Sequence, residues 1–270
     1  NGNLICSSEE SILRVVQYSE TVDKKIKLDE LRKHLYYSEK IKDAYPYVTS
    51  YYEKNWGFCL KYNEYINLKE DNYHVFIESV FVEDFINVYE FLIKGELKDE
   101  ILFSTYLCHP EMYNNETSGP VVFSEILRLL ISKKNKYSYR FVMGPETIGP
   151  ICYLSEFAEK IKGSNFSAYN LTCLGRGDSL KIVKPRTENK ALRIIEAMGE
   201  EEFNIFFDSY LKRGSDERQY NFPNVNIPMI TICKDKFNEY DEYHTSNDIY
   251  KPEYLKDILG SIDFFKKLIN

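Results

Sequence analysis

The sequence predicts an α/β fold in which a mostly parallel sheet carries helices on both faces, together with a small, mostly β subdomain. From residue 101 onward, apolar runs of strand length alternate with segments whose apolar residues recur at helical spacing. Before that, short β-leaning runs are separated by polar turns. Strand and helix alternation of this length is typical of a parallel sheet covered by helices. We therefore place the subdomain at residues 1–97 and the α/β domain at residues 98–270.

The first part of the chain contains three β-leaning runs and one helical segment. Polar and apolar side chains alternate from His74 to Val80, which predicts a strand exposed on one face. Strands are expected at residues 12–16, 73–82 and 85–92, and a helix at residues 28–35.

The second part alternates strands with helices. Strands are expected at residues 101–107, 139–143, 166–174 and 226–233, and helices at residues 121–131, 148–161, 191–198 and 254–269. In sheets of this kind, ligands collect at the carboxyl ends of the strands. The loops that follow the strands are therefore where chemistry is expected.

Charge and composition exclude several classes of function. The chain has 35 Lys and Arg against 42 Asp and Glu, a formal net charge of −7, whereas nucleic-acid-binding surfaces usually have a basic excess. No apolar stretch approaches the roughly 18 residues of a membrane helix, and no secretion signal opens the chain. Its six cysteines form no CxxC pair, which indicates reduced thiols. We expect a soluble, cytoplasmic protein without nucleic-acid or membrane partners. Because it begins with Asn, we expect a fragment or a trimmed chain.

Three polar loops follow predicted strands and carry candidate catalytic side chains. His109 lies in residues 108–120, Glu146 in residues 144–150 and His244 in residues 242–248. The other two histidines, His34 and His74, fall in a helix and a strand and are interpreted as structural. Two loop histidines and one Glu are the minimum of a hydrolytic zinc site. The same loops are also explained by side chains that only cap the following helices.

A fourth segment, residues 214–220, is dense in charge. It is either a solvated turn or a loop that presents Asp216 and Arg218 to a polar substrate. Catalysis by a Cys108 nucleophile is disfavoured, because the adjacent side chains of Cys108 and His109 point to opposite faces of a strand.

Several motifs taken together resemble a known family. They are CHPEMYNNETSGP, YRFVMGPETIGP, GSDERQYNFPNVNIP and EYHTS, with YVTSYYEKNWGFCL upstream. This set is similar to the aminopeptidase-like proteins of bacterial polysaccharide-biosynthesis loci, relatives of two-zinc bacterial aminopeptidases and glutaminyl cyclases. The resemblance implies a phosphorylase/hydrolase-like zinc-exopeptidase α/β/α sandwich with a small inserted β subdomain. The usual form of the family carries further segments at both ends.

The resemblance also implies roles for individual residues. His109 and His244 match the first and last metal-binding histidines, and Glu146 matches the catalytic Glu. Asn115 falls where these enzymes have a metal-binding Asp. Asp216 matches an acidic residue that lines the site.

The sequence departs from the family at three ligand positions. Asn115, Thr147 and Thr172 stand where two-zinc enzymes have carboxylates, which neutralise the metals. One weakly bound zinc is therefore expected, held by His109, Asn115 and His244 and helped by Asp216 or Glu116.

The expected activity is hydrolysis of a small amide, amino-acid or sugar-amide substrate, with Glu146 activating the water. Arg218 or Gln219 is expected to orient a carboxylate or sugar hydroxyl, and Tyr243 and Thr147 to line the site. Two alternatives stay open: a non-catalytic binding protein with a degenerate metal site, and an enzyme of cyclase or acyl-transfer type. A homo-oligomer is compatible with the sequence.

Overall fold

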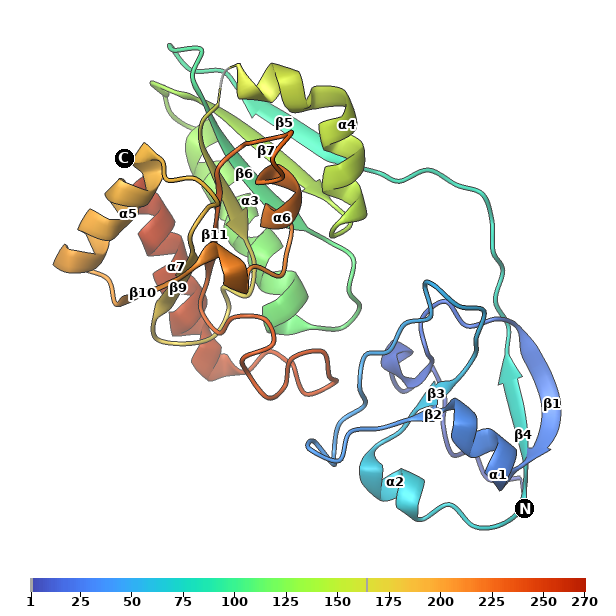
Figure 1. Ribbon diagram of the computed structural model, residues 1–270. Helices are drawn as coiled ribbons and strands as arrows, with labels where there is room; N and C mark the ends of the chain where they lie inside the picture. Colours follow the sequence, from blue (N-terminus) through green and yellow to red (C-terminus); the bar gives the residue numbers. More distant parts are fainter. Residues whose placement is uncertain (1, 164) are drawn as a thin grey trace. The chain divides into compact units, whose positions relative to one another are not determined.

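The computed structural model describes residues 2–163 and 165–270, and the chain divides into two compact units. The smaller unit comprises Asn1–Asp84, Pro110–Met112 and Asp241–Ile249. The larger unit comprises Phe85–His109, Tyr113–Tyr240 and Tyr250–Asn270. Figure 1 draws most of the smaller unit in blue and cyan.

The smaller unit is built from short elements around its own apolar core. Its longest strands, β1 (Val22–Lys27) and β4 (Asn72–Ile77), pair antiparallel with Val22 opposite Ile77. Two short strands, β2 (Leu35–Tyr36) and β3 (Phe58–Cys59), pair in parallel. The helices are α1 (Leu28–Leu31), α2 (Tyr62–Ile66) and the 3-10 turns Ile12–Arg14 and Arg32–His34.

Two sequence predictions for this part of the chain are corrected. The strand expected at residues 12–16 is wrong: Ile12–Arg14 is a 3-10 turn, because the Ser11 hydroxyl accepts the Leu13 N–H at 3.1 Å and caps it. The strand expected at residues 85–92 exists as β5 (Tyr89–Ile93), but it pairs with β7 in the sheet of the larger unit.

The larger unit contains a seven-stranded mixed sheet in the order β10-β9-β11-β8-β6-β7-β5. Its central pairs are parallel, β6 with β7 and β8, and β8 with β11, which confirms the predicted α/β class. Two pairs are antiparallel, β5 with β7 and β9 with β11. The strands are β6 (Glu100–Tyr106), β7 (Ser138–Gly144), β8 (Asn165–Leu171), β9 (Leu180–Val183), β10 (Ile205–Asp208) and β11 (Met229–Cys233).

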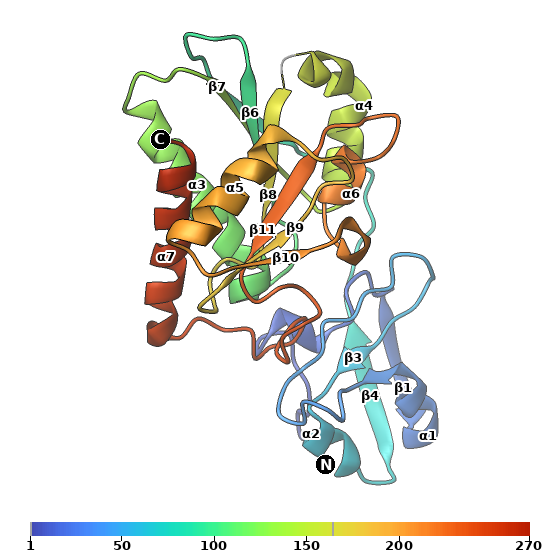
Figure 2. The same cartoon turned by 60° about the vertical axis from the view of Figure 1, so that its left-hand side comes forward.

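Helices cover both faces of this sheet, as Figure 2 shows. One face packs against α3 (Ser118–Ile131), α5 (Lys190–Glu201) and α7 (Leu255–Leu268). The other packs against α4 (Ile148–Lys162) and α6 (Glu217–Tyr220). Side chains alternate along β6, so that Ile101 and Phe103 join the first core and Leu102 joins the second. The unit is therefore an α/β/α sandwich. In the described residues, no helix has the length and apolar character that crossing a membrane requires.

A buried ion network ties together the strands that lead to the candidate site. Arg140 in β7 is fully buried, and its Nε and Nη2 donate to the Glu100 carboxylate of β6 at 2.6 and 2.9 Å. Its Nη1 lies 2.6 Å from Glu90 Oε2 in β5. Because three neighbouring strands share this network, it fixes their register next to the core.

The start of α3 approaches the sheet closely at Gly119. A Cβ at this position would lie 2.7 Å from both the Leu171 carbonyl oxygen and Thr105 Oγ1. Only a glycine therefore lets α3 begin directly above β6 and β8, next to the loop that carries His109.

Candidate functional site

Three predicted site positions gather at one edge of the larger sheet. His109 follows β6, Glu146 follows β7 and Thr172 follows β8. Because these strands are parallel neighbours, their carboxyl ends meet at the same edge. The structure thus brings His109 and Glu146 together, as the strand pattern predicts.

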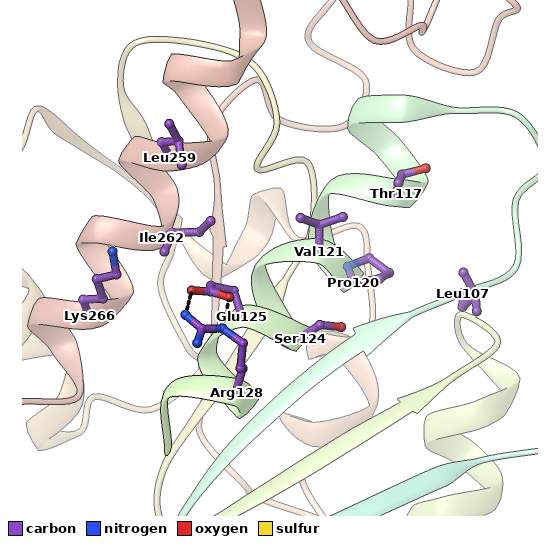
Figure 3. Close-up of a pocket in the computed structure, with 10 residues that line it drawn as sticks. All are labelled: Leu107, Thr117, Pro120, Val121, Ser124, Glu125, Arg128, Leu259, Ile262 and Lys266. Atoms are coloured by element: carbon purple, nitrogen blue, oxygen red, sulfur yellow. Dashed lines mark hydrogen bonds and ion pairs between the residues drawn. The ribbon is translucent and has the colours of Figure 1, made fainter. Parts of the chain in front are cut away.

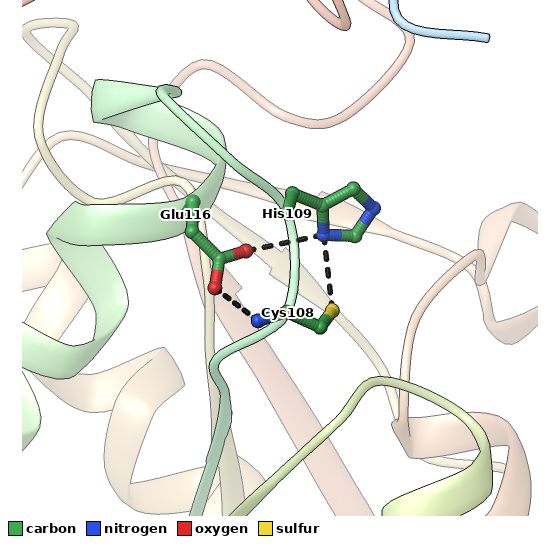
Figure 4. Close-up of side chains that lie close together, drawn as sticks. All are labelled: Cys108, His109 and Glu116. Atoms are coloured by element: carbon green, nitrogen blue, oxygen red, sulfur yellow. Dashed lines mark hydrogen bonds and ion pairs between the residues drawn. The ribbon is translucent and has the colours of Figure 1, made fainter. Parts of the chain in front are cut away.

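The His109 ring lies between two carboxylates. Its Nδ1 is 3.1 Å from Glu116 Oε2, and its Nε2 is 3.9 Å from Glu146 Oε2. The Cys108 sulfur also lies 3.2 Å from Nδ1, as Figure 4 shows. The expectation that these adjacent side chains point to opposite faces of a strand is therefore wrong, because β6 ends at Tyr106 and both residues lie in the loop after it. Metal-binding histidines usually donate their second ring N–H to a carboxylate, which fixes the tautomer. Glu116 is placed for that role, which directs Nε2 toward Glu146.

Glu116 reaches His109 from a π-helical turn, Tyr113–Thr117, that leads into α3. Turns of this kind are rare and occur frequently at functional sites. The side chain is buried, and its Oε1 accepts the Cys108 N–H, so both carboxylate oxygens are engaged. From the sequence, Glu116 is expected only to assist the zinc ligands, because its spacing from His109 matches no metal-binding motif.

Glu146 is held by a serine that the sequence analysis does not single out. Ser215 Oγ donates to Glu146 Oε1 at 2.8 Å, and 24% of the Glu146 side chain is exposed. Burial raises the pKa of Glu146, while His109, Ser215 and Arg218 oppose that rise. A carboxylate whose pKa is raised toward neutrality is a better proton acceptor for catalysis.

Asp216 is buried beside this carboxylate. Its Oδ1 accepts the Thr147 N–H at 2.8 Å, whereas its Oδ2 has no hydrogen-bond partner among the described residues. Burial raises the pKa of Asp216 well above its usual range, and the negative charge of Glu146 raises it further. A buried acceptor without a partner is costly, so the place next to Oδ2 suits a proton or a cation.

Arg218 and Gln219 are expected from the sequence to orient the substrate. Arg218 is exposed, with its Nη2 donating to Thr147 Oγ1 at 3.1 Å and its Nε donating to the Ser215 carbonyl at 3.2 Å. Gln219 keeps a buried Oε1 that has no partner in the part of the chain that the structure describes. Their role in substrate binding remains a prediction.

Asn115 and Thr172 are joined by a tyrosine. The Asn115 side-chain amide donates to the Tyr106 hydroxyl at 3.1 Å, and this hydroxyl lies 2.5 Å from Thr172 Oγ1. All three residues are at most 2% exposed. Sequence analysis misses Tyr106 because it ends the apolar run of a buried strand. A neutral hydrogen-bond network therefore occupies the positions where the two-zinc enzymes are expected to have carboxylates.

His244 and Tyr243 belong to the smaller unit. Their rings stack at 3.9 Å, and the Tyr47 ring packs edge-on against His244 at 5.2 Å. The His244 carbonyl accepts the Tyr47 N–H at 2.8 Å. His109 belongs to the larger unit, and pairing of His244 with His109 stays a prediction.

Among the described residues, three side chains form a group that could hold a metal ion. Ligand atoms of Cys108, His109 and Glu116 lie within 4.8 Å of one another, and thiolate, imidazole and carboxylate groups are the ligands that zinc prefers. The buried Asp216 Oδ2 lacks a partner within residues 2–163 and 165–270, and a cation nearby would offset its charge. A second cation would need the further carboxylates that Asn115, Thr147 and Thr172 replace.

A hollow of about 650 Å³ lies between α3 and α7 (Figure 3). Apolar side chains make up much of its lining, and an ion pair between Glu125 and Arg128 borders it. Neither His109 nor Glu146 lines this hollow. It therefore gives no direct information on the chemistry at the strand ends.

Comparisons with known proteins agree with this architecture. A family described as a domain of unknown function (DUF4910) matches residues 25–270. A Clostridium acetobutylicum protein, provisionally named a polysaccharide biosynthesis protein with an aminopeptidase-like domain, is 36% identical over 252 residues. That alignment covers 92% of this chain and 57% of the relative.

Two solved structures share the fold. A crystal structure of a provisionally named peptidase from Clostridium acetobutylicum has a TM-score of 0.94 and 33% identity, covering 99% of this chain and 64% of that chain. A zinc aminopeptidase from Bacillus subtilis has a TM-score of 0.65 and 16% identity, covering 87% of this chain and 62% of that chain. The chain thus spans between half and two thirds of the length of these relatives.

The fold of the zinc aminopeptidases is therefore that of this chain, as the motif resemblance implies. The match over residues 25–270 shows that the chain belongs to the DUF4910 family.

Proposed function

We propose that this chain carries the catalytic fold of a hydrolase that uses one zinc ion to cleave an amide bond. The observation that carries the proposal is the His109 ring held between Glu116 and Glu146 at the carboxyl edge of the sheet. His109 would hold the ion through Nε2, and Asn115 and His244 are the further ligands that the sequence predicts. When bound, the ion would polarise a carbonyl group and lower the pKa of a water molecule.

The side chains of the site supply the proton transfers. Glu116 accepts the Nδ1–H of His109, the tautomer that turns Nε2 toward the ion. Glu146, whose pKa burial raises, takes a proton from water and returns it to the amine that leaves. The Ser215 hydroxyl fixes one oxygen of Glu146 and leaves the other for this transfer.

The proposed substrate is a small peptide-like amide or an acylated amino sugar. The name of the Clostridium acetobutylicum relative connects that protein to polysaccharide biosynthesis. Arg218 is exposed next to the Glu146 turn and presents a fork of N–H donors. Such a fork suits a substrate carboxylate or sugar hydroxyl.

The first experiment measures metal and activity together. Protein purified without chelator is analysed for bound metals, and its melting temperature is followed during a zinc titration. At a zinc concentration about 100 times the Kd, stability should rise by about 2.7 kcal/mol. Absence of bound metal together with an unchanged melting temperature would refute a metal-dependent hydrolase.

A second experiment tests the role of Glu146. Amino-acyl anilides and N-acylated amino sugars are incubated with the zinc-loaded protein, and products are identified by mass spectrometry. Glu146→Gln should lower kcat at least about 100-fold while zinc still binds. Glu156→Gln, on the exposed side of α4, the helix that follows Glu146, is the matched control and should leave kcat unchanged.

A second candidate function is a binding protein without catalysis. The neutral network of Tyr106, Asn115 and Thr172 favours it, because it stands where two-zinc enzymes have acidic ligands. Asn115→Asp should then confer zinc binding and hydrolysis that the parent lacks. Asn114→Asp adds the same charge one residue away and serves as the control. If the parent already binds zinc and hydrolyses amides, the binding-protein alternative fails.

A further inference from the structure

The Glu146 loop contains a strained turn. Thr147 has φ 67° and ψ −61°, and the Ile148 N–H donates to the Glu146 carbonyl at 2.7 Å. These are the angles and the hydrogen bond of a γ-turn of the rare, strained kind. For a β-branched residue a positive φ is a genuine outlier. Strain of this kind costs on the order of a few RT and persists only where surrounding contacts impose it.

Residues 215–218 supply contacts that hold this turn. The Thr147 N–H donates to Asp216 Oδ1 at 2.8 Å, and Arg218 Nη2 donates to Thr147 Oγ1 at 3.1 Å. Ser215 Oγ donates to the Glu146 carboxylate at 2.8 Å. Asp216 is 1% exposed, so water cannot readily replace it as the acceptor. One short segment therefore contacts the strained residue and the carboxylate beside it.

Within the described chain, positive φ occurs at six other non-glycine residues, of which Asn226 and Asn238 have a simple local explanation. Asn226 and Asn238 have φ 52° and 62°, and Asn tolerates such angles better than other residues do. Thr147 has no comparable local tolerance. Its conformation must therefore come from the packing around it.

We propose that Asp216 is a positioning residue that holds Thr147 in the strained turn and thereby aims Glu146 at His109. Without the Asp216 acceptor, Thr147 relaxes to negative φ, which changes the path of the chain into α4 and moves the Glu146 carboxylate. The functional meaning of this positioning rests on the proposed function, in which Glu146 is the general base. The hydrogen bond and the strain can be tested without any substrate.

The first test is a double-mutant cycle on the metal-free chain. Asp216→Ala and Asp216→Asn both remove the charge, but only Asn keeps an oxygen that can accept the Thr147 N–H. We expect the folding equilibrium constant of Asp216→Ala to be about tenfold lower than that of Asp216→Asn. In a Thr147→Gly background, glycine adopts the φ and ψ angles of this turn freely. The ratio of the two folding equilibrium constants should then shrink to less than about twofold. An equal gap in both backgrounds, or no gap, overturns the proposal.

The strain can also be measured if Asp216→Ala fails to fold. Thr147→Gly and Thr147→Ala both remove the contact with Arg218, but only glycine relieves a positive φ. The folding equilibrium constant of Thr147→Gly should exceed that of Thr147→Ala by at least about threefold. Asn238→Gly, at another positive φ without contact to Asp216, is the control and should show no coupling to position 216. Equal or greater stability of Thr147→Ala overturns the proposal.

The second test reads out the position of Glu146. In protein labelled with carbon-13 at the Glu carboxyl groups, the Glu146 signal is assigned by its loss in Glu146→Gln. Its chemical shift should differ between Asp216→Ala and Asp216→Asn. Because both variants remove the same charge, such a difference reports a displacement of the Glu146 carboxylate. A role confined to stability would leave the signal of the folded protein in place, and that result overturns positioning.

The two proposals fail in different ways. If the parent binds no zinc and hydrolyses no amide, but the cycle and the Glu146 signal behave as expected, the proposed function is wrong and the positioning role stands. If the parent is an active hydrolase, Asp216→Ala should lower kcat relative to Asp216→Asn with KM unchanged. Identical kcat values for the two variants overturn the positioning role and leave the hydrolase in place.

Discussion

Replacement of Asp216 by Asn should stabilise the metal-free protein at neutral pH. The Asp216 carboxyl is 1% exposed, one oxygen accepts the Thr147 N–H, and the other has no partner in the described chain. Asn keeps the first contact and removes the charge. An unpartnered buried group costs more when it is charged than when it is neutral, and Asn places a neutral N–H group where Asp has an ionised oxygen. We therefore expect the free energy of unfolding to rise by about 1–3 kcal/mol.

The gain should depend on pH with a definite sign. Burial raises the pKa of Asp216 well above its usual range, so the folded state binds this proton more tightly than the unfolded state. The stability that Asp216 contributes is therefore fully present below its unfolded pKa of about 3.9 and is lost as pH rises through the folded pKa. The advantage of Asp216→Asn should thus be small near pH 4 and grow toward neutral pH.

Urea unfolding in the presence of chelator, repeated over this range of pH, measures the effect. Far-ultraviolet circular dichroism follows the chain, and the fluorescence of Trp56, the single Trp, follows the smaller unit, which does not contain Asp216. Asp257→Asn is the control, because Asp257 is 7% exposed and one of its oxygens accepts the Gly177 N–H at 3.3 Å. This control should bring no gain. The reasoning is refuted if Asp216→Asn is no more stable than the parent at neutral pH, or if its advantage stays constant as the pH falls.

Three further predictions test the parts around the site. Arg140→Met should lower the free energy of unfolding by about 3–5 kcal/mol in urea, because it leaves the buried Glu100 carboxylate without its cation. A loss below about 1 kcal/mol would contradict the network. Gly119→Ala should cost about 1–3 kcal/mol because its Cβ meets backbone. Gly163→Ala, where the nearest atom is 3.7 Å away, should cost nothing, and equal losses would contradict the close approach. Cys108 and Cys152 are both solvent-exposed residues. Iodoacetamide should still alkylate Cys108 more slowly, measured by mass spectrometry of peptides, because partial burial of its thiol and the nearby Glu116 carboxylate raise the pKa of Cys108, and the thiolate is the nucleophile. Faster alkylation of Cys108 would reopen the thiol mechanism.

The order of strands and helices in the larger unit could be read from hydrophobic periodicity, because long apolar runs have few alternative structures. The strand expected at residues 101–107 is β6, and the helix expected at residues 148–161 is α4. The four-residue strands β9 and β10 are missed, since runs so short carry little periodic signal. The strand at residues 85–92 is found, but its partner is not, because pairing depends on residues far along the chain.

The candidate site, too, could be predicted from the sequence only in part. The sequence places His109 and Glu146 in loops after strands, and parallel neighbours bring such loops together. It gives no sign that Glu116 orients His109, or that Tyr106 joins Asn115 to Thr172, because those contacts follow from the packing of turns.

By itself, the sequence determined the α/β class, the family resemblance and the two strand-end residues on which the proposed chemistry depends. Only the tertiary structure decided how Glu146 is held, because the Asp216 oxygen that fixes its turn lies 69 residues away from Thr147 along the chain. Periodicity describes neighbours in sequence, whereas this hydrogen bond forms only when α4 and the loop before α6 pack on the same face of the sheet.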